Sequence, residues 1–331
     1  MRVCLKASKG EAYLSKLFLV TGGAGFIGSH LVERLVRDGK GVRIIDDLTT
    51  GKRENIEPFL SEVEFVHGDV RDLELLRRAM DGVDYVLHQA AIPSVPRSID
   101  DPATTNSVNV EGTLNVLIAA RDAGVKRVVY ASSSSVYGDS PTLPKRETMR
   151  PEPLSPYAVG KLAGELYCQV FHRVYGLETV ALRYFNVFGP RQDPESQYAG
   201  VVPKFINLLL AGDPPTIFGD GEQSRDFTYV QDVVDANLLA VEAEGVSGEV
   251  FNIACGERLT INRLVEILSD LVGAKRRPTY ASPRPGDVKH SVADVAKAKA
   301  LLGYTPAVTV QEGLKRTLDW ILANRDSKGM P

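Results

Sequence analysis

The first half of the chain alternates short, almost continuously apolar runs with amphipathic segments. Six apolar runs predict strands, at 17–20, 42–46, 63–69, 83–91, 125–134 and 179–187. Amphipathic stretches predict helices after the first strand, at 72–80, after Asn106 and from Ser155 onward. Strands that are apolar on both faces and that alternate with helices are typical of a doubly wound parallel sheet, an α/β fold.

The alternation loosens beyond about residue 186 into loops rich in proline and glycine, with scattered helices. We therefore predict a sheet domain over 17–185, to which a segment near 230–257 returns, and a smaller α+β lobe made of 186–229 and 258–325. Residues 1–16 have no continuous apolar core and do not resemble a secretory signal, so we interpret them as an N-terminal extension.

Composition narrows the class of protein. The 331 residues are 44% hydrophobic and 24% charged, as in soluble globular proteins. The net charge of −3 gives no reason to expect nucleic acid or an anionic membrane as a partner, and no apolar stretch is long enough to span a bilayer. Cys4, Cys168 and Cys255 are far apart and odd in number, which favours buried thiols in a reducing cytoplasm. The histidines lack metal-ligand spacing, so we predict no metal.

A glycine-rich turn joins the first strand to the first helix. Gly22, Gly25 and Gly28 would permit a tight turn and a close approach of the backbone to a pyrophosphate. The N–H groups at the start of the helix would then face the phosphates. Asp46 ends the second strand, where a carboxylate accepts hydrogen bonds from a ribose diol and repels a 2′-phosphate. The pattern predicts NAD as cofactor, although Asp46 could instead be a solvated turn residue beside Asp47.

The segment SPYAVGK places a tyrosine and a lysine four residues apart. Ser155 can cap a helix that starts at Pro156, and Tyr157 and Lys161 would then lie on one face. Such pairs are common on solvated helices, so the spacing alone does not establish chemistry.

A free phenol has a pKa near ~10 and is a poor base at neutral pH. Lowering that pKa by ~3 units takes roughly 4 kcal/mol, which an ammonium about 4 Å away can supply at an effective dielectric constant of ~20. Bound NAD⁺ would add to this effect. Ser132 to Ser135 end the fifth strand at the same edge of the sheet and either supply a hydroxyl group or form a flexible loop.

Five motifs, TGGAGFIG, HGDV, ASSSSVYG, SPYAVGK and RYFNVFGP, together resemble the extended short-chain dehydrogenase/reductase family and, within it, the nucleotide-sugar 4-epimerases. The motifs keep the family's order, and the resemblance runs from about Leu17 to near the C-terminus. It implies that Tyr157 is the general base, Lys161 its electrostatic partner and Ser133 the catalytic hydroxyl. Related dehydratases carry Asp and Glu at the two positions held here by Ser134 and Ser135, so a 4,6-dehydratase is not expected.

The resemblance also implies two binding sites. The NAD site would contain Gly22, Gly25, Phe26, Ile27, Gly28, Asp46, Asp69, Val70, Gln89, Ala90, Ala91, Tyr157 and Lys161. The UDP-sugar site would contain Ser94, Ser133, Ser134, Tyr157, Asn186, Gln192, Val202, Phe218, Arg225, Arg284, Asp287 and Ser291. Arg225 and Arg284 match phosphate ligands, and an arginine fork suits a diphosphate, although either could be an ordinary surface arginine.

The segments HQAAIPSVPRSIDDP and RQDPESQYAGVVP most resemble the UDP-N-acetylglucosamine 4-epimerases. Relatives confined to unacetylated sugars carry a bulky aromatic residue where this chain has Ser291, so the serine implies room for a 2-acetamido arm. A wide pocket rejects smaller analogues weakly, so UDP-glucose and UDP-galactose are also expected to react.

Several alternatives remain. The protein could be a UDP-glucose 4-epimerase only, a UDP-glucuronate 4-epimerase, a net dehydrogenase, or a protein that senses NAD or a nucleotide sugar without turnover. The resemblance further implies a homodimer through helices that start near Asn106 and Ser155.

Overall fold

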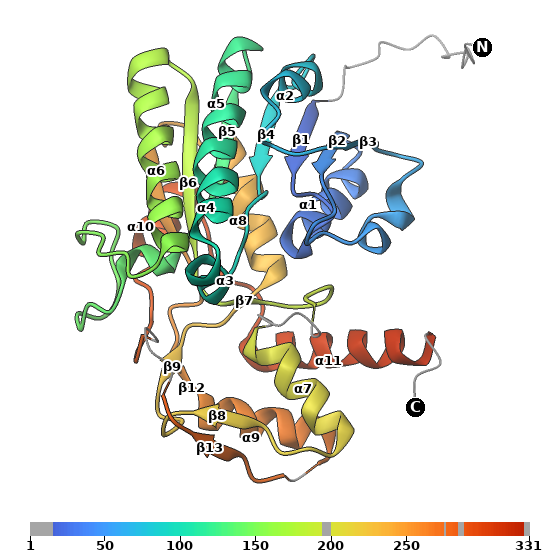
Figure 1. Ribbon diagram of the computed structural model, residues 1–331, viewed down its shortest axis with the longest axis vertical. Helices are drawn as coiled ribbons and strands as arrows, with labels where there is room; N and C mark the ends of the chain where they lie inside the picture. The colour runs from blue at the N-terminus through green and yellow to red at the C-terminus, as the bar shows by residue number, and fades with distance from the viewer. Residues whose placement is uncertain (1–15, 194–199, 275, 284–287, 328–331) are drawn as a thin grey trace.

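The computed structural model describes residues 16–193, 200–274, 276–283 and 288–327. A parallel sheet of seven strands, in the order β11-β6-β5-β4-β1-β2-β3, lies between two layers of helices (Figure 1). Its strands are β1 (Leu17–Thr21), β2 (Gly41–Asp46), β3 (Glu64–His67), β4 (Tyr85–His88), β5 (Arg127–Ser133), β6 (Glu178–Tyr184) and β11 (Glu249–Ile253). The predicted doubly wound α/β fold is confirmed.

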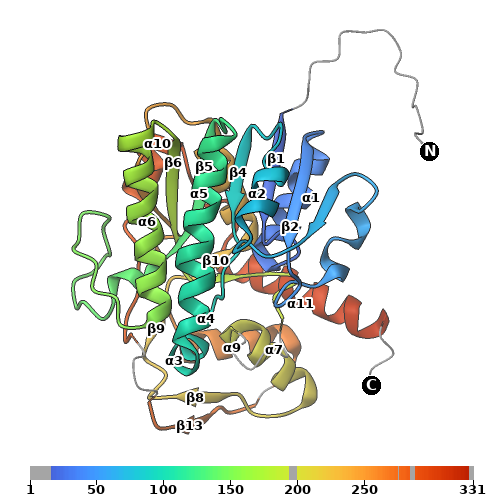
Figure 2. The same cartoon turned by 45° about the horizontal axis from the view of Figure 1, so that its top comes forward.

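Two hydrophobic cores fill the space between the sheet and its helices. One core packs the sheet against α1 (Phe26–Arg37), α8 (Val230–Glu242) and α10 (Ala296–Leu302). The other packs it against α2 (Leu73–Ala79), α5 (Gly112–Asp122) and α6 (Pro156–Tyr175). Figure 2 shows α5 and α6 side by side on one face of the sheet. No helix in the described part of the chain is both long and apolar enough to cross a membrane.

Three predicted boundaries were wrong. The strand predicted at 83–91 ends at His88, because Gln89 to Ala91 leave the sheet and line a cleft. The strand predicted at 179–187 ends at Tyr184, and Asn186, with φ of 31°, turns the chain toward the short β7 (Val187–Phe188).

The helix expected to start near Asn106 begins earlier, with α4 (Pro102–Asn106), and reaches α5 through the π-helical turn η3 (Ser107–Glu111). The Asp101 carboxylate caps α4 by accepting a hydrogen bond from the Thr104 N–H at 3.0 Å. A cap of this kind fixes where a helix starts.

A smaller lobe lies beyond the carboxyl ends of the strands and has its own core (Figure 1). Its helices are α7 (Val201–Ala211), α9 (Ile261–Val272) and α11 (Val310–Ser327). Its short strands form the pairs β8 (Thr216–Phe218) with β13 (Thr279–Ala281), β9 (Ser224–Arg225) with β12 (Leu259–Thr260), and β10 (Thr228–Tyr229) with β7. Short helices in the connections are α3 (Val95–Asp100), η1 (Arg53–Asn55), η2 (Glu57–Phe59) and η4 (Ser134–Tyr137). Of the predicted extension 1–16, only Lys16 lies within the described residues.

Hydrogen bonds to the Asp226 side chain connect this lobe to the end of the sheet. The fully buried carboxylate accepts hydrogen bonds from the N–H groups of Cys255 and Gly256, both at 3.0 Å, and of Ala293, at 3.1 Å. Cys255 and Gly256 follow β11 in the chain, so one side chain satisfies backbone donors from two separate segments.

We expect Asp226→Ala to lower the free energy of unfolding by about 3 kcal/mol, because three buried N–H groups lose their acceptor. Chemical denaturation measures this change. Asp220→Ala is the matched control, because the carboxylate of Asp220 is exposed and accepts a hydrogen bond from the nearby Glu222 N–H at 2.9 Å. Equal stabilities of the two variants would contradict the role of Asp226.

Candidate active site

A cleft with a volume of about 770 Å³ opens at the carboxyl ends of the parallel strands. All thirteen residues expected to hold the cofactor, from Gly22 to Lys161, line it. Ligands of open α/β sheets bind at this edge, where neighbouring loops diverge. The structure therefore brings the complete predicted set, drawn from the carboxyl ends of the four strands β1 to β4 and from helix α6, to a single cavity.

The glycine turn forms a cradle that side chains would fill. Gly22 has φ of 67°, and a Cβ there would lie 2.7 Å from the backbone nitrogen of Ala90. A Cβ on Gly28 would lie 2.1 Å from the carbonyl oxygen of Gly22. Helix α1 starts directly after Gly25 without a side-chain cap. The uncapped N–H groups and the close backbone approach fit a pyrophosphate.

Asp46 lies beside this cradle. One carboxylate oxygen accepts a hydrogen bond from the Ala24 N–H at 2.9 Å and the other from the Leu48 N–H at 2.8 Å. Burial raises the pKa of Asp46, and these two hydrogen bonds lower it. Only 6% of its surface is exposed, unlike that of a solvated turn residue. Because each oxygen has a second lone pair, the carboxylate can still accept hydrogen bonds from a ribose.

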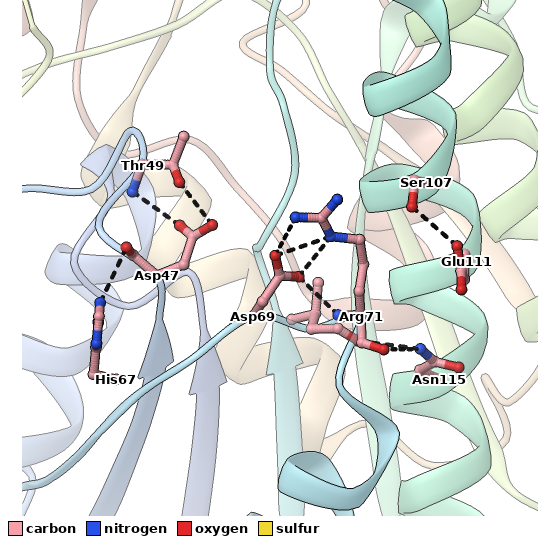
Figure 3. A network of polar contacts seen from close by, with 9 residues as sticks. Asp47, Thr49, His67, Asp69, Arg71, Ser107, Glu111 and Asn115 are labelled. Atoms are coloured by element: carbon pink, nitrogen blue, oxygen red, sulfur yellow. Dashed lines mark hydrogen bonds and ion pairs between the residues drawn. The ribbon is translucent and has the colours of Figure 1, made fainter.

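Short-range polar contacts fix the rim of the cleft next to β2 and β3 (Figure 3). Arg71 Nε donates to both carboxylate oxygens of Asp69, at 3.0 and 2.9 Å, and this contact lowers the pKa of Asp69. Asn115 Nδ2 donates to the Arg71 carbonyl at 3.0 Å, and the Asp47 carboxylate accepts from the N–H and the hydroxyl of Thr49 at 2.9 and 2.8 Å. These contacts are made within the protein itself and do not depend on a bound ligand.

Helix α6 carries the tyrosine–lysine pair into the cleft. Ser155 caps the helix, with its Oγ accepting a hydrogen bond from the Ala158 N–H at 3.2 Å. Lys161 is buried, and its Nζ donates to the Ala131 carbonyl of β5 at 2.8 Å. The same Nζ lies 5.9 Å from the centroid of the Tyr157 ring. The two residues thus share one helix face, as the spacing predicts.

Ser133, the last residue of β5, completes the group. Its Oγ accepts hydrogen bonds from the N–H of Ser135 at 3.2 Å and from the hydroxyl of Ser135 at 2.9 Å, and it lies close enough to Tyr157 to lower the pKa of that phenol. The serine run is thus an ordered turn.

The protein's own groups keep the Tyr157 phenol protonated at neutral pH. Burial raises the pKa of Tyr157, and the contact with Ser133 lowers it. Burial also lowers the pKa of Lys161 to about 7, so that near neutral pH this side chain is only partly charged. Lys161 alone therefore stabilises a Tyr157 phenolate less than a fully charged ammonium would. A phenolate here needs additional positive charge.

The residues expected to bind a UDP-sugar fall into two groups. Ser94, Tyr157 and Gln192 line the cleft, and Ser133 and Ser134 stand at the end of β5 beside it. The others belong to the smaller lobe or to the connection into it: Asn186, Val202, Phe218, Arg225 and Ser291.

Within this second group, Ser291 lies beside β9, because its N–H donates to the Ser224 carbonyl at 3.0 Å next to Arg225. Asn186 Nδ2 donates to the Asp226 carbonyl at 3.1 Å. Arg284 and Asp287 lie outside the described residues.

The structure adds charged residues at the mouth of the cleft that the sequence argument missed. Lys52 Nζ lies 3.1 Å from Asp193 Oδ1, and Arg191 pairs with Glu33 of α1. Arg97 also lines the cleft. Arg191 and Glu33 are 158 positions apart, so no local pattern could reveal their contact. Among the described residues, no three His, Cys, Asp or Glu side chains gather closely enough to hold a metal ion.

A tyrosine and a lysine on one helix face, beside a dinucleotide cradle on a doubly wound sheet, are the arrangement of the extended short-chain dehydrogenases/reductases. The chain belongs to the NAD dependent epimerase/dehydratase family, whose model matches residues 18–254.

It is similar to a UDP-glucose 4-epimerase of Mycolicibacterium smegmatis, with 43% identity over 91% of this chain and 97% of that protein. Among solved structures, a UDP-glucose 4-epimerase of Thermotoga maritima with UDP-glucose has 42% identity and a TM-score of 0.89, over 93% of this chain and 99% of that one. A UDP-N-acetylglucosamine 4-epimerase of Methanobrevibacter ruminantium, in complex with UDP-N-acetylmuramic acid, has 44% identity and a TM-score of 0.90, over 94% and 99% of the two chains. The protein is therefore an NAD-dependent epimerase.

We expect Tyr157→Phe to reduce epimerase turnover by about 10²- to 10⁴-fold, the range for loss of a general base, while the protein still binds NAD. Steady-state kinetics and the absorbance of the bound dinucleotide test the two parts separately. Tyr167→Phe, on the same helix, is the matched control and should keep full activity. A fully active Tyr157→Phe protein would exclude this tyrosine as the base.

Proposed function

We propose that this epimerase inverts C4 of UDP-hexoses. It interconverts UDP-N-acetylglucosamine with UDP-N-acetylgalactosamine, and UDP-glucose with UDP-galactose. The observation that carries the proposal is the position of Tyr157, Lys161 and Ser133 at the edge of the cleft that contains the glycine cradle. The substrates printed in the names of its relatives support the same class of ligand.

In this mechanism Tyr157 removes the proton of the 4-hydroxyl and later returns it. Ser133 holds the substrate oxygen and the phenol together, and the Lys161 ammonium stabilises the phenolate. The glycine cradle and Asp46 would hold NAD, which would supply a hydride acceptor and donor for C4 and a positive ring beside the phenolate. Between the two transfers the 4-keto sugar turns over in the pocket, so the uracil and diphosphate must be held more firmly than the sugar.

The residues after Ser133 argue against elimination of water. Ser134 and Ser135 are hydroxyl residues with no acidic function near neutral pH, whereas elimination across C5–C6 needs an acid and a base. The Ser135 hydroxyl also donates a hydrogen bond to Ser133 Oγ. The site is therefore equipped for oxidation and reduction at C4 alone.

The smaller lobe is the proposed site of the UDP group. Arg225 with Arg284 would bind the diphosphate, Phe218 and Asp287 the uridine, and Asn186 the sugar or diphosphate. Ser291, Ser94 and Gln192 would wall the sugar pocket, with Val202 behind them. Ser291 is a small side chain at the position where relatives confined to unacetylated sugars carry a bulky aromatic residue, which supports the acetylated sugars as substrates.

A UDP-glucuronate 4-epimerase would need a cation for the substrate carboxylate. Among the arginines that line the cleft, Arg191 is paired with Glu33, which disfavours that use, and Arg97 is the residue that this alternative would require. A net dehydrogenase would exchange its cofactor, whereas an epimerase regenerates NAD in every cycle and should retain it on a desalting column. A sensor without turnover would not need Tyr157, Lys161 and Ser133 together.

We expect the purified protein, without added NAD, to turn over UDP-N-acetylglucosamine and UDP-glucose in parallel assays of the C4-inverted products. Ser291→Tyr should reduce kcat/KM for the acetylated sugar by about 10- to 100-fold and that for UDP-glucose much less, because the added ring occupies the acetamido space. Ser291→Ala is the control and should preserve both activities. An equal loss for both sugars, or no turnover of UDP-glucose by the natural protein, would refute this account of the pocket.

We further propose a homodimer through the outer face of α6. Val159, Leu166, Val170 and Val174 recur on this helix and are each about half exposed or more. Ile99 of α3, which packs against α6, and Leu154, which precedes α6 in the chain, are also exposed apolar residues. A patch of this kind on an otherwise polar surface indicates a protein–protein contact.

Light scattering should therefore give twice the chain mass of 36.1 kDa for the natural protein. Leu166→Glu combined with Val170→Glu should give the monomer mass, because charges would be buried in the interface. Leu322→Glu, an exposed position on α11, is the control and should remain dimeric. A monomeric natural protein would refute the dimer.

A further inference from the structure

A buried ion pair lies directly behind the catalytic edge of the sheet. Arg183 Nε and Nη2 donate to the two carboxylate oxygens of Glu165 at 2.8 and 2.7 Å. The exposed fractions of the two side chains are 4% and 2%. Neither residue lines the cleft, and the mechanism proposed above uses neither of them.

Glu165 connects the catalytic helix to two strands. It follows Tyr157 and Lys161 at the same four-residue spacing on α6, so it lies on the same face, one turn beyond Lys161. Ser132 of β5 and Arg183 of β6 are direct partners in the sheet, and both donate hydrogen bonds to the Glu165 carboxylate. One carboxylate therefore sets the position of α6 relative to the ends of β5 and β6.

Arg183 extends the connection to the turn that begins at Ser133. Its guanidinium carbon lies 4.6 Å from the ring centroid of Tyr137, which belongs to η4. The hydroxyl of Tyr137 donates to Asn252 Oδ1 of β11 at 2.7 Å. The guanidinium thus contacts Glu165 on the helix and Tyr137 on the turn, and the two catalytic groups Tyr157 and Ser133 belong to these same two elements.

The contact between α6 and β5 is close at this place and contains no side chain from position 164. Gly164, next to Glu165, faces Tyr130, and a Cβ there would lie 2.3 Å from the Tyr130 hydroxyl oxygen. The helix therefore approaches β5 closely, without a side chain from position 164 that interdigitates with the strand. The bidentate contact between Arg183 and Glu165, in contrast, has a defined direction and therefore fixes α6 relative to β6.

We propose that Glu165 and Arg183 form a positioning pair, which fixes the distance of the Tyr157 phenol and the Lys161 ammonium from Ser133. A contribution to folding stability does not account for this buried pair, because replacing a buried ion pair with apolar residues of similar volume is often neutral or stabilising. A misplacement of reacting groups by about 1 Å, in contrast, costs on the order of 10²-fold in rate.

A second ion pair between the same strands provides a matched control. Arg127 of β5 and Glu178 of β6 are also direct partners, at the opposite end of the sheet from the cleft. Their side chains are joined by a contact of 2.6 Å between Arg127 Nη2 and Glu178 Oε2. Glu178→Gln weakens this pair and should leave the kinetics unchanged, because the Arg127–Glu178 pair does not touch α6 or η4.

The test compares the natural protein with Glu165→Met/Arg183→Met, Glu165→Gln and Glu178→Gln. The double variant should unfold at a temperature close to that of the natural protein, retain NAD and keep KM. Its kcat for C4 epimerisation should fall by about tenfold or more, because the catalytic groups are no longer held at one distance. An unchanged kcat in the folded double variant would overturn the proposal. If that variant does not fold, Glu165→Gln is tested in its place. It keeps the shape of the side chain but leaves one oxygen to accept from Arg183, and an unchanged kcat would again overturn the proposal.

The kinetic readout rests on the proposed function, so a second readout uses no substrate. Titration of the phenolate absorbance with NAD bound, taken as the difference from a matching Tyr157→Phe protein, reports the pKa of Tyr157. That pKa should be higher in the double variant, because α6 no longer holds the phenol at a fixed distance from Ser133, whose contact lowers this pKa, and unchanged in Glu178→Gln. An unaltered pKa in the double variant overturns the positioning role. Absence of UDP-sugar turnover by the natural protein would refute the proposed function alone.

Discussion

The active site depends on one contact between a helix and a strand, the hydrogen bond from the Lys161 ammonium to the Ala131 carbonyl. This bond joins α6 to the end of β5, where the chain turns into Ser133 and η4. Lys161 is also buried, and burial lowers its pKa to about 7. Near neutral pH, its side chain is therefore only partly charged. In the proposed mechanism, a second positive charge from the cofactor would lower the pKa of Tyr157.

Charge balance in this cleft couples cofactor binding to chemistry. Burial raises the pKa of Tyr157, so without a cationic ring beside it the phenol is an inert hydroxyl. In the proposed mechanism, this dependence would make Tyr157 a base only when the cofactor is bound. The polar rim around Asp69 and Arg71, and the ion pairs of Lys52 and Arg191 at the mouth, surround the same cavity.

The smaller lobe is attached through buried polar groups rather than through an extended apolar interface alone. Asp226 receives N–H groups from the segment after β11 and from Ala293, and Asn186 donates to the Asp226 backbone. The same stretch of sequence also contains Arg225, a proposed ligand of the diphosphate. Attachment of the lobe and placement of the substrate therefore rely on neighbouring residues, and the directional hydrogen bonds of Asp226 set the geometry of both.

The sequence by itself determined the fold class, the six strands that precede residue 186, and the face of α6 that carries Tyr157 and Lys161. These features follow from local periodicity, a serine cap and glycines that tight turns require, all of which are properties of contiguous residues. Only the tertiary structure decided the contacts of Glu165 with Arg183, of Arg191 with Glu33 and of Asp226 with the segment after β11. The partners in these contacts are brought together by packing across the sheet and between the lobes, so neither spacing nor composition contains them. The same is true of the balance that holds Tyr157 protonated, because burial, which sets that balance, is a property of the folded chain.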